Sequence, residues 1–243
     1  MIRRVNLLGR YLVGMGLALA LSACNFTDDT PTYRYRLKVE VETPEGLKSG
    51  SSVIEVNTGF GRSPMAPSSR ALRFKVRGEA AAVDLGERGV LFALLRSENE
   101  VEWASHVMFL LTPQVTSSDG RDYEATFAEM LKRRGEIELP RYFPIQGMRR
   151  PARPMLVTFG DLDEPTSVEK VAPDNLAATF GEDVELRRIT VQLTTDPVTT
   201  GIEDQLWWLS EYYSRMLDGQ RLNVSNDLAN NLTQSDFSKE SKK

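Results

Sequence analysis

Residues 33–43 read YRYRLKVEVET, and this stretch decides the fold class. Tyrosine, leucine and valine alternate strictly with arginine, lysine and glutamate. A period of two places one face of an extended chain in a core and the other in water, so a β-strand is predicted. Residues 43–46, Thr-Pro-Glu-Gly, follow as a turn, because proline and glycine favour the backbone angles that turns require.

The rest of the chain predicts more short strands joined by polar turns. The expected strands are residues 53–57, 72–76, 81–85, 90–95, 101–111, 155–159 and 184–194. Their alternation slips near Arg187 and Arg188, which indicates a β-bulge. The hairpin-like spacing favours an antiparallel sheet.

Helices are predicted over residues 122–134, 173–180 and 205–217. The first ends in Lys-Arg-Arg and the second in Phe, each just before a glycine, which is a stop signal. Residues 200–203, Thr-Gly-Ile-Glu, form a capping box ahead of the third. We therefore expect a mainly β (α+β) fold, an antiparallel β-sandwich-like domain with two or three short helices.

The order of segments predicts one β-rich globular domain over residues 33–218. A chain of that length buries about 70% of its unfolded surface in a single core. Residues 24–32 are short and polar and are expected to act as a tether. Residues 219–243 are rich in Asn, Ser and Lys, and they are predicted to be a disordered tail.

Residues 1–23 predict a signal peptide. Three arginines, Arg3, Arg4 and Arg10, precede residues 11–23, which carry no charge. A helix that spans a bilayer needs about twenty apolar residues, so this run is too short and has the size of a secretory signal.

Residues 21–24, Leu-Ser-Ala-Cys, resemble the lipobox of bacterial lipoproteins. The resemblance covers about the first 25 residues and implies cleavage after Ala23 and a lipid on the sulfur of Cys24. It implies an envelope protein that faces the periplasm and contacts the membrane through its lipid. Asn25, in place of an aspartate, favours the outer over the inner membrane. The alternative is an ordinary secretory signal that ends beside a cysteine.

Residues 155–209 resemble an uncharacterised type of proteobacterial lipoprotein. The resemblance covers about a quarter of the chain. No activity is attached to it, so it carries over no catalytic or binding residue.

Charge and composition limit the classes of molecule that the protein is expected to bind. The apolar fraction of 41% and the charged fraction of 26% are typical of a soluble globular protein. The net charge of −4 leaves no excess of cations for a nucleic-acid backbone, so no nucleic acid is expected. Loss of the three arginines in residues 1–23 makes the mature charge −7, which predicts repulsion from anionic headgroups.

The chain shows few catalytic or metal-binding patterns. A single cysteine excludes disulfides and cysteine zinc clusters, and the single histidine, His106, falls in the expected strand 101–111 as a partly exposed residue. Phosphate-binding glycine motifs and GxSxG do not occur. Asp161, Asp163 and Glu164 form a solvated turn or, as the alternative, a calcium loop. No cofactor or metal is expected.

Two stretches are free of acidic residues. The first lies between Glu55 and Glu79 and the second between Glu138 and Asp161. The first contains Arg62, Arg70, Arg73, Lys75 and Arg77, and the second contains Arg141, Arg149, Arg150 and Arg153. Together they predict a patch for headgroups, a polyanionic glycan or an acidic partner; the alternative is a pair of ordinary surface loops.

Aromatic residues offer a second candidate surface. Trp207 and Trp208 would stack on carbohydrate or anchor a partner, or else close a core. The candidate binding residues are thus Arg149, Arg150, Arg153, Trp207 and Trp208. We expect a non-catalytic binding or assembly component that contacts another envelope protein or a glycan. The alternatives are a carboxylate-based hydrolase of glycan or peptide and a carrier of a hydrophobic ligand.

Overall fold

The computed structural model describes residues 30–63, 66–118, 120–145 and 149–239, with backbone only for residues 62, 63 and 66–70. The chain is mainly β and its strand pairs are antiparallel, which confirms the predicted fold class. A six-stranded sheet has the order β12-β3-β2-β1-β11-β8, a four-stranded sheet the order β10-β9-β5-β4, and β6 pairs with β7. Within the described residues, no helix is long and apolar enough to span a bilayer.

The strands and helices have the following bounds. The strands are β1 (Thr32–Thr43), β2 (Gly46–Ser63), β3 (Ala66–Glu79), β4 (Ala81–Asp84), β5 (Val90–Ala93), β6 (Thr116–Ser117), β7 (Gly120–Arg121), β8 (Ile137–Glu138), β9 (Leu156–Phe159), β10 (Val168–Val171), β11 (Glu185–Thr194) and β12 (Ser238–Lys239). The α-helices are α1 (Trp103–Leu110), α2 (Tyr123–Lys132), α3 (Ala177–Phe180), α4 (Leu228–Asn231) and α5 (Gln234–Phe237). The 3-10 helices are η1 (Gly86–Arg88), η2 (Pro165–Ser167), η3 (Ile202–Asp204) and η4 (Leu209–Tyr212).

β1 has the alternation that its sequence predicts. Its inward side chains, Tyr33, Tyr35, Leu37, Val39 and Val41, are all buried. It lies between β2 and β11 and pairs with both along its length. The predicted bulge is confirmed, since Glu40 pairs with Arg188 and Val41 with Leu186, which leaves Arg187 as the extra residue.

β2 and β3 are much longer than predicted. Outside their centres these strands are rich in glycine and polar residues, so the hydrophobic pattern reveals only the centres. Gly50 marks the point where β2 passes directly over β4. A Cβ atom at Gly50 would lie 1.8 Å from the carbonyl oxygen of Ala82, so only glycine allows this approach.

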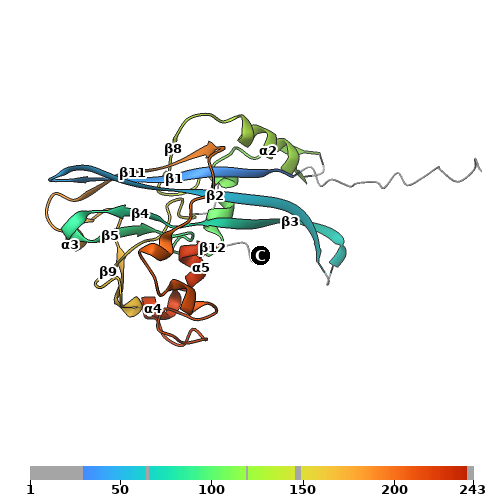
Figure 1. Cartoon of the computed structure of the whole chain (residues 1–243). Coiled ribbons are helices and arrows are strands. Elements are labelled where there is room, and N and C mark those ends of the chain that lie inside the picture. The colour runs from blue at the N-terminus through green and yellow to red at the C-terminus, as the bar shows by residue number, and fades with distance from the viewer. Residues whose placement is uncertain (1–29, 64–65, 119, 146–148, 240–243) are drawn as a thin grey trace, which may run out of the picture.

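The two central strands of the four-stranded sheet, β5 and β9, are almost entirely buried on both faces. In and just after β5, Leu91, Ala93 and Leu95 join the core under the six-stranded sheet. Phe92 and Leu94 belong to a second core, which the C-terminal residues 202–237 cover. Figure 1 shows this small sheet between the large sheet and the C-terminal segment that carries α4 and α5.

The prediction of a strand over residues 101–111 is wrong, because α1 occupies this position. The segment is apolar almost throughout, and a short apolar run does not distinguish a buried strand from a buried helix. Trp103, Ala104, Val107 and Met108 are all fully buried, so core contacts rather than local pattern select the helix. α2 confirms the predicted helix and begins at Asp122, whose side chain accepts a hydrogen bond from the amide of Ala125. α3 forms only the end of its predicted segment.

The predicted helix over residues 205–217 is also wrong. Here the chain forms η4 and turns, and η3 precedes this segment, starting after Gly201, which has φ 119° and no side-chain cap. The carboxylate of Glu79 binds the amides of Gly201 and Ile202, so β3 supplies the acceptor that the capping box was expected to supply.

The prediction of a disordered tail is wrong for residues 219–239. Leu232 and Phe237 are fully buried, and β12 pairs with the end of β3. Thr233 and Asp236 form a reciprocal capping box that begins α5. Ala229, Leu232 and Phe237 therefore order this polar segment by entering the second core, whereas Leu222 and Val224 are exposed. Residues 240–243 lie outside the described part.

Candidate functional site

The proposed lipidation site lies just before the folded chain. Ala23 and Cys24 fall outside the described residues, and β1 begins at Thr32, eight positions after Cys24. Eight extended residues span at most about 28 Å. We call the end of the six-stranded sheet at which β1 begins the tether end.

A groove of about 750 Å³ opens beside the first residues of β1. β8 pairs with β11 only at Thr190 and Val191. Within the described residues, the last part of β11 therefore has a neighbouring strand on one edge alone, which is β1. The turn after α2 forms the opposite wall. The groove, here called the β11 groove, is lined by Thr32, Tyr33, Arg34, Glu55, Leu131, Arg133, Arg134, Gly135, Gln192, Leu193, Thr194 and Thr195.

Two arginines give the β11 groove its charge. Arg34 is neutralised by Glu55, whose carboxylate lies 2.7 Å from its Nε. Arg133 donates to the carbonyl of Leu111 at 2.7 Å, and Arg134 donates to the carbonyls of Leu131 and Arg133. Among the described residues, neither Arg133 nor Arg134 has a carboxylate within ion-pair distance, so both keep their full positive charge.

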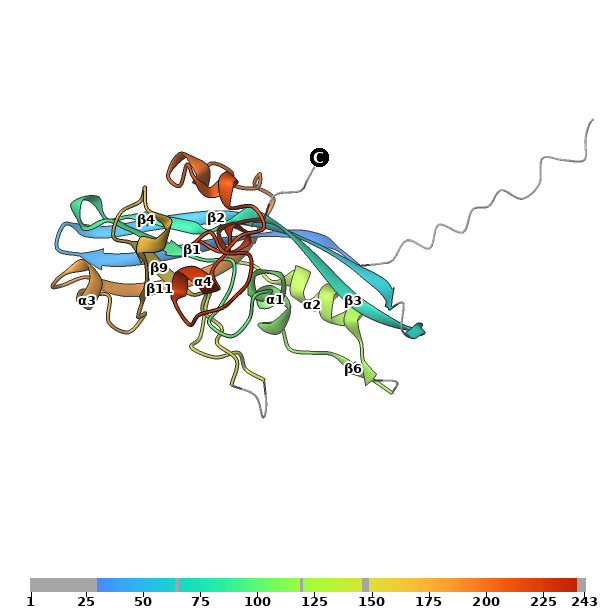
Figure 2. The same ribbon diagram turned by 90° about the horizontal axis from the view of Figure 1, so that it is seen from below.

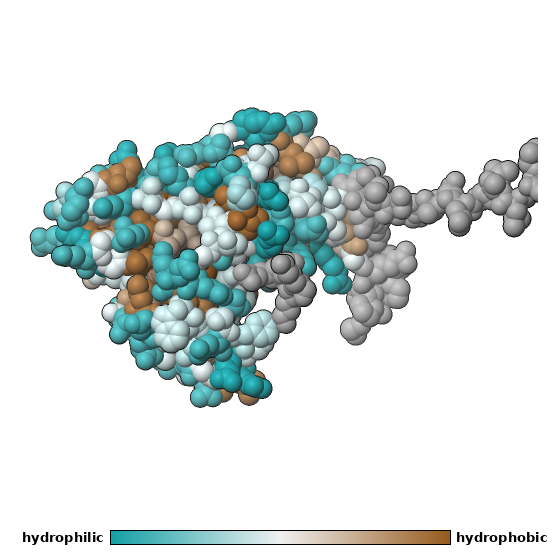
Figure 3. Space-filling model, in the orientation of Figure 1, coloured by the Kyte–Doolittle hydropathy of each residue, from teal (hydrophilic) through white to brown (hydrophobic). Residues whose placement is uncertain are grey.

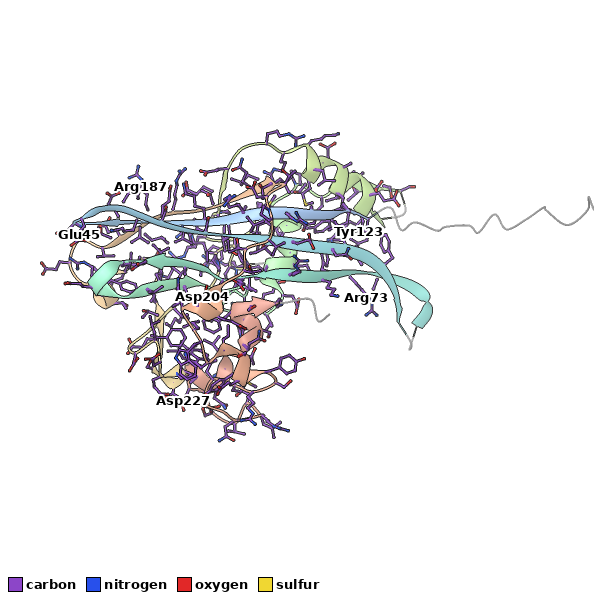
Figure 4. The ribbon with its side chains drawn as sticks, viewed as in Figure 1. Glu45, Arg73, Tyr123, Arg187, Asp204 and Asp227 are labelled. Atoms are coloured by element: carbon purple, nitrogen blue, oxygen red, sulfur yellow. The ribbon has the colours of Figure 1, made fainter. Side chains whose placement is uncertain are left out.

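Other cations of the first acid-free stretch lie near the tether end. Arg73, Lys75 and Arg77 share the outer face of β3 and are exposed. Lys75 pairs in register with Asn57, which pairs with Thr32. Figure 4 places Arg73 and Tyr123 at the tether end and Glu45 at the opposite end. The side chains of Arg62 and Arg70 lie outside the described part.

The second acid-free stretch forms a hairpin-like loop. Tyr142 forms an isolated bridge with Pro151, and Phe143 and Ala152 donate backbone hydrogen bonds across the loop to Arg150 and Arg141. We call residues 141–145 and 149–153 the arginine hairpin. Arg141 forms an ion pair with Asp174 at 3.0 Å. One cation of the arginine hairpin is therefore neutralised by the body of the protein.

The three predicted arginines of this hairpin have different surroundings. Arg150 forms an ion pair with Glu100, and Arg153 donates to the carbonyl of Leu139 at 3.4 Å. Arg149 is exposed, and its guanidinium lies 4.7 Å from the centre of the Tyr142 ring. Arg150 and Arg153 therefore hold the loop to the body, and Arg149 alone presents an exposed charge.

His106 also contacts Glu100, the partner of Arg150. Its Nδ1 lies 2.8 Å from the carboxylate of Glu100, and its ring meets the Phe74 ring edge-on at 4.6 Å. Burial raises the pKa of Glu100, but hydrogen bonds from His106 and Arg150 outweigh it and lower the pKa overall. The contacts of Glu100 therefore join α1 to the arginine hairpin, and the ring contact with Phe74 joins α1 to β3.

The two tryptophans are separated by their environments. Trp208 is 2% exposed, packs against Phe159 and donates to the carbonyl of Leu162 at 2.7 Å. Trp207 is 58% exposed, and its Nε1 donates to Asp163 at 2.7 Å. Trp208 therefore closes the second core, and only Trp207 is available to a ligand. Neither shares a contact residue with the arginine hairpin.

The carboxylates of Asp161 and Glu164, in the acidic turn at residues 161–164, accept hydrogen bonds from nearby residues. The carboxylate of Asp161 accepts from the amide of Asp163, and that of Glu164 accepts from the amide and hydroxyl of Thr166. The hydrogen bonds from Thr166 also lower the pKa of Glu164. In the described part of the chain, no group of three or more His, Cys, Asp or Glu side chains is placed to hold a metal ion.

Sequence reasoning missed the role of Arg133 and Arg134, which it treated only as a helix stop signal. Two adjacent cations beyond a helix end are a visible pattern, but their freedom from carboxylates depends on the packing around them. Comparisons of this chain with models of protein families, with curated proteins and with solved structures found no match.

Proposed function

We propose that this chain is a lipid-anchored protein of the bacterial cell envelope and that its folded part is a non-catalytic binding component. The lipid is attached to Cys24, the protein faces the periplasm, and the outer membrane is favoured over the inner. The lipobox resemblance of residues 21–24 supports the anchor. The position of the β11 groove beside the start of β1 carries the binding function, since it brings a cationic site within tether length of the membrane.

The lining of the β11 groove indicates the chemistry of its ligand. Guanidinium groups are the preferred partners of phosphate and carboxylate, because their planar donors match two acceptor oxygens. Leu131, which is 39% exposed, and Leu193 add an apolar wall. The groove is thus suited to an anionic group carried on an apolar body.

The hydrolase alternative would be favoured by carboxyls whose pKa values the fold has shifted for catalysis. Burial raises the pKa of Asp236, but this carboxylate caps α5 and lies near Arg96. The pKa of Glu40 is lowered by its cationic neighbours Arg188 and Lys38. Structural contacts therefore explain both shifts.

The anchor is tested by growth of cells with an alkyne fatty acid, followed by labelling of the protein and membrane fractionation. We expect label and membrane association in the wild type and loss of both in Cys24→Ala. Because the chain has one cysteine, this substitution removes every thiol. Equal fractionation of the two proteins, or no label on the wild type, would overturn the lipid anchor.

The β11 groove is tested by a photo-crosslinking amino acid placed at Leu131 in living cells. The matched control carries it at Leu47, which is 52% exposed on β2 near the opposite end of the sheet. We expect an adduct from Leu131 that Arg134→Glu abolishes. The same adducts from both positions would contradict the assignment of the site.

A further inference from the structure

Charge is distributed unequally along the six-stranded sheet. At the tether end, Lys75, Arg121, Lys132 and Arg134 are exposed and Arg133 is half-buried. The acidic residues nearby are largely engaged, since Glu55 pairs with Arg34 and Glu129 with Lys132, while Asp122 caps α2 and Glu124 is exposed.

The opposite end of the sheet is acidic. Glu42 pairs in register with Glu185, and Arg88 joins η1 to this end through Glu45 and the carbonyl of Phe180. The exposed carboxylates here are Glu42, Glu45, Asp84, Glu87, Glu182, Asp183 and Glu185. They outnumber the cations among them, which are Lys48, Arg88 and Arg187.

Two hairpins lie at the tether end. Figures 1 and 2 both show the β2–β3 hairpin at this end, and Figure 2 shows β6 at the same end. Phe60 and Tyr123 meet edge-on at 6.0 Å, with Arg121 6.0 Å from the Tyr123 ring. Aromatic rings beside cations are typical of surfaces at the headgroup level of a bilayer. The face in Figure 3 is largely hydrophilic, with its hydrophobic residues in small separate groups.

We propose that the tether end docks on the anionic headgroups of the membrane to which the protein is anchored, so that the long sheet stands upright on the bilayer. This inference rests on the proposed lipid anchor, and it names the ligand of the cationic end as the phosphate-bearing headgroup of an anionic lipid. The tether of at most about 28 Å permits the contact.

The distance between the two ends explains why the net negative charge does not prevent docking. β1 has 12 residues, which extend over about 40 Å. The Debye length is about 8 Å at physiological ionic strength, so the acidic end is screened from the membrane. The net negative charge predicts repulsion from the membrane, but the cations nearest the bilayer are attracted to its anionic headgroups and determine the interaction.

The test uses the chain from Cys24 to Lys243, coupled through its only thiol to a maleimide lipid in vesicles. One set of vesicles contains phosphatidylcholine alone and the other also contains phosphatidylglycerol. We expect amide hydrogen exchange in β7 and at the end of α2 to slow at least about twofold on the anionic vesicles. The protection should disappear at about 1 M salt, where the Debye length is about 3 Å.

Two double variants separate the local charge from the net charge. Lys75→Glu with Arg121→Glu reverses the tether end, and Lys48→Glu with Arg187→Glu makes the same net change at the opposite end. With uncoupled protein, we expect the first variant to bind anionic vesicles at least about tenfold more weakly than the second. Lys75, Arg121 and Arg187 are exposed and Lys48 is half-buried, so equal thermal unfolding of the two variants verifies the fold.

Equal vesicle binding by the two double variants, or equal protection on both kinds of vesicle, would overturn the docking. Chemical coupling makes this result independent of lipidation in cells. A failure of docking leaves the fatty-acid label on Cys24 intact, and a failure of the anchor leaves the vesicle result intact.

Discussion

The carboxylate of Glu79 accepts a hydrogen bond of 2.9 Å from the backbone amide of Ile202. It accepts a second, of 3.2 Å, from Gly201. Glu79 ends β3 and is 4% exposed, whereas Ile202 begins the segment that covers the second core. Together with the pairing of β12 and β3, this side chain therefore attaches the C-terminal layer to the six-stranded sheet.

Loss of this carboxylate should loosen the C-terminal layer. We expect Glu79→Ala to lower the free energy of unfolding by about 2–4 kcal/mol, because the buried amide of Ile202 and the partly buried amide of Gly201 lose their acceptor. Glu79→Gln keeps one acceptor oxygen and should lose about half as much. Urea denaturation measures both values. Wild-type stability in the alanine variant would show that water replaces the carboxylate.

The close approach of β2 to β4 should make Gly50 intolerant of any side chain. We expect Gly50→Ala to destabilise the fold by about 3 kcal/mol, since its methyl group would overlap the carbonyl of Ala82. Gly59→Ala is the matched control on the same strand, because no atom lies within 4 Å of its added Cβ. Thermal unfolding should leave this control within about 0.5 kcal/mol of the wild type. Similar effects of the two substitutions would contradict the crossing geometry.

The arginine hairpin should respond differently at two adjacent positions. Arg150→Glu places a second carboxylate beside Glu100, and we expect a loss of about 2–3 kcal/mol. Arg149→Glu changes an exposed residue that has no carboxylate partner among the described residues, so its effect should stay within about 0.5 kcal/mol. The two variants carry the same charge, so chemical denaturation isolates the contact with Glu100. Equal losses would show that the hairpin responds to net charge alone.

The stability of the outer sheet face should depend on pH through Glu40. Hydrogen bonds from Arg188 and Lys38 lower the pKa of Glu40 from about 4.5 to about 2. A lowered folded-state pKa means that ionisation favours the fold, so this contribution is complete above pH 4.5 and is lost as the pH falls towards 2.

Substitution of this carboxylate should remove that pH dependence. We expect Glu40→Gln to be about 1 kcal/mol less stable than the wild type at pH 7, since the partly exposed partners reduce the effect, and equally stable near pH 2. Glu42→Gln is the control, because Glu42 is exposed on the same strand. A difference for Glu40→Gln that does not change with pH would contradict the assignment.

Much of the large sheet can be predicted from local pattern. β1 alternates because it separates a core from water along its whole length, and the bulge at Arg187 is visible as a break in that alternation. β5 and α1 are buried on more than one side, so their apolar runs lack a diagnostic period. The C-terminal layer cannot be predicted from its pattern for the opposite reason, because only a few buried residues, such as Leu232 and Phe237, hold it to the core.

The candidate site is less predictable than the fold. The sequence indicates that arginines gather in two acid-free stretches. It does not indicate which of them are neutralised, because their carboxylate partners lie far away in the chain. Arg150 meets Glu100, and Arg188 meets Glu40 across 148 positions. Which cations stay free to bind an anion therefore depends on the packing of distant segments.

The sequence by itself determined the antiparallel β class through residues 33–43, and it indicates the lipid anchor through residues 21–24. Both are local properties, since alternation and a cleavage motif are complete within a short stretch of chain. Only the tertiary structure decided that residues 103–110 are helical, that residues 219–239 are ordered and that free cations gather at the tether end. The physical reason is that burial and charge neutralisation are set by neighbours in space, which local sequence does not contain.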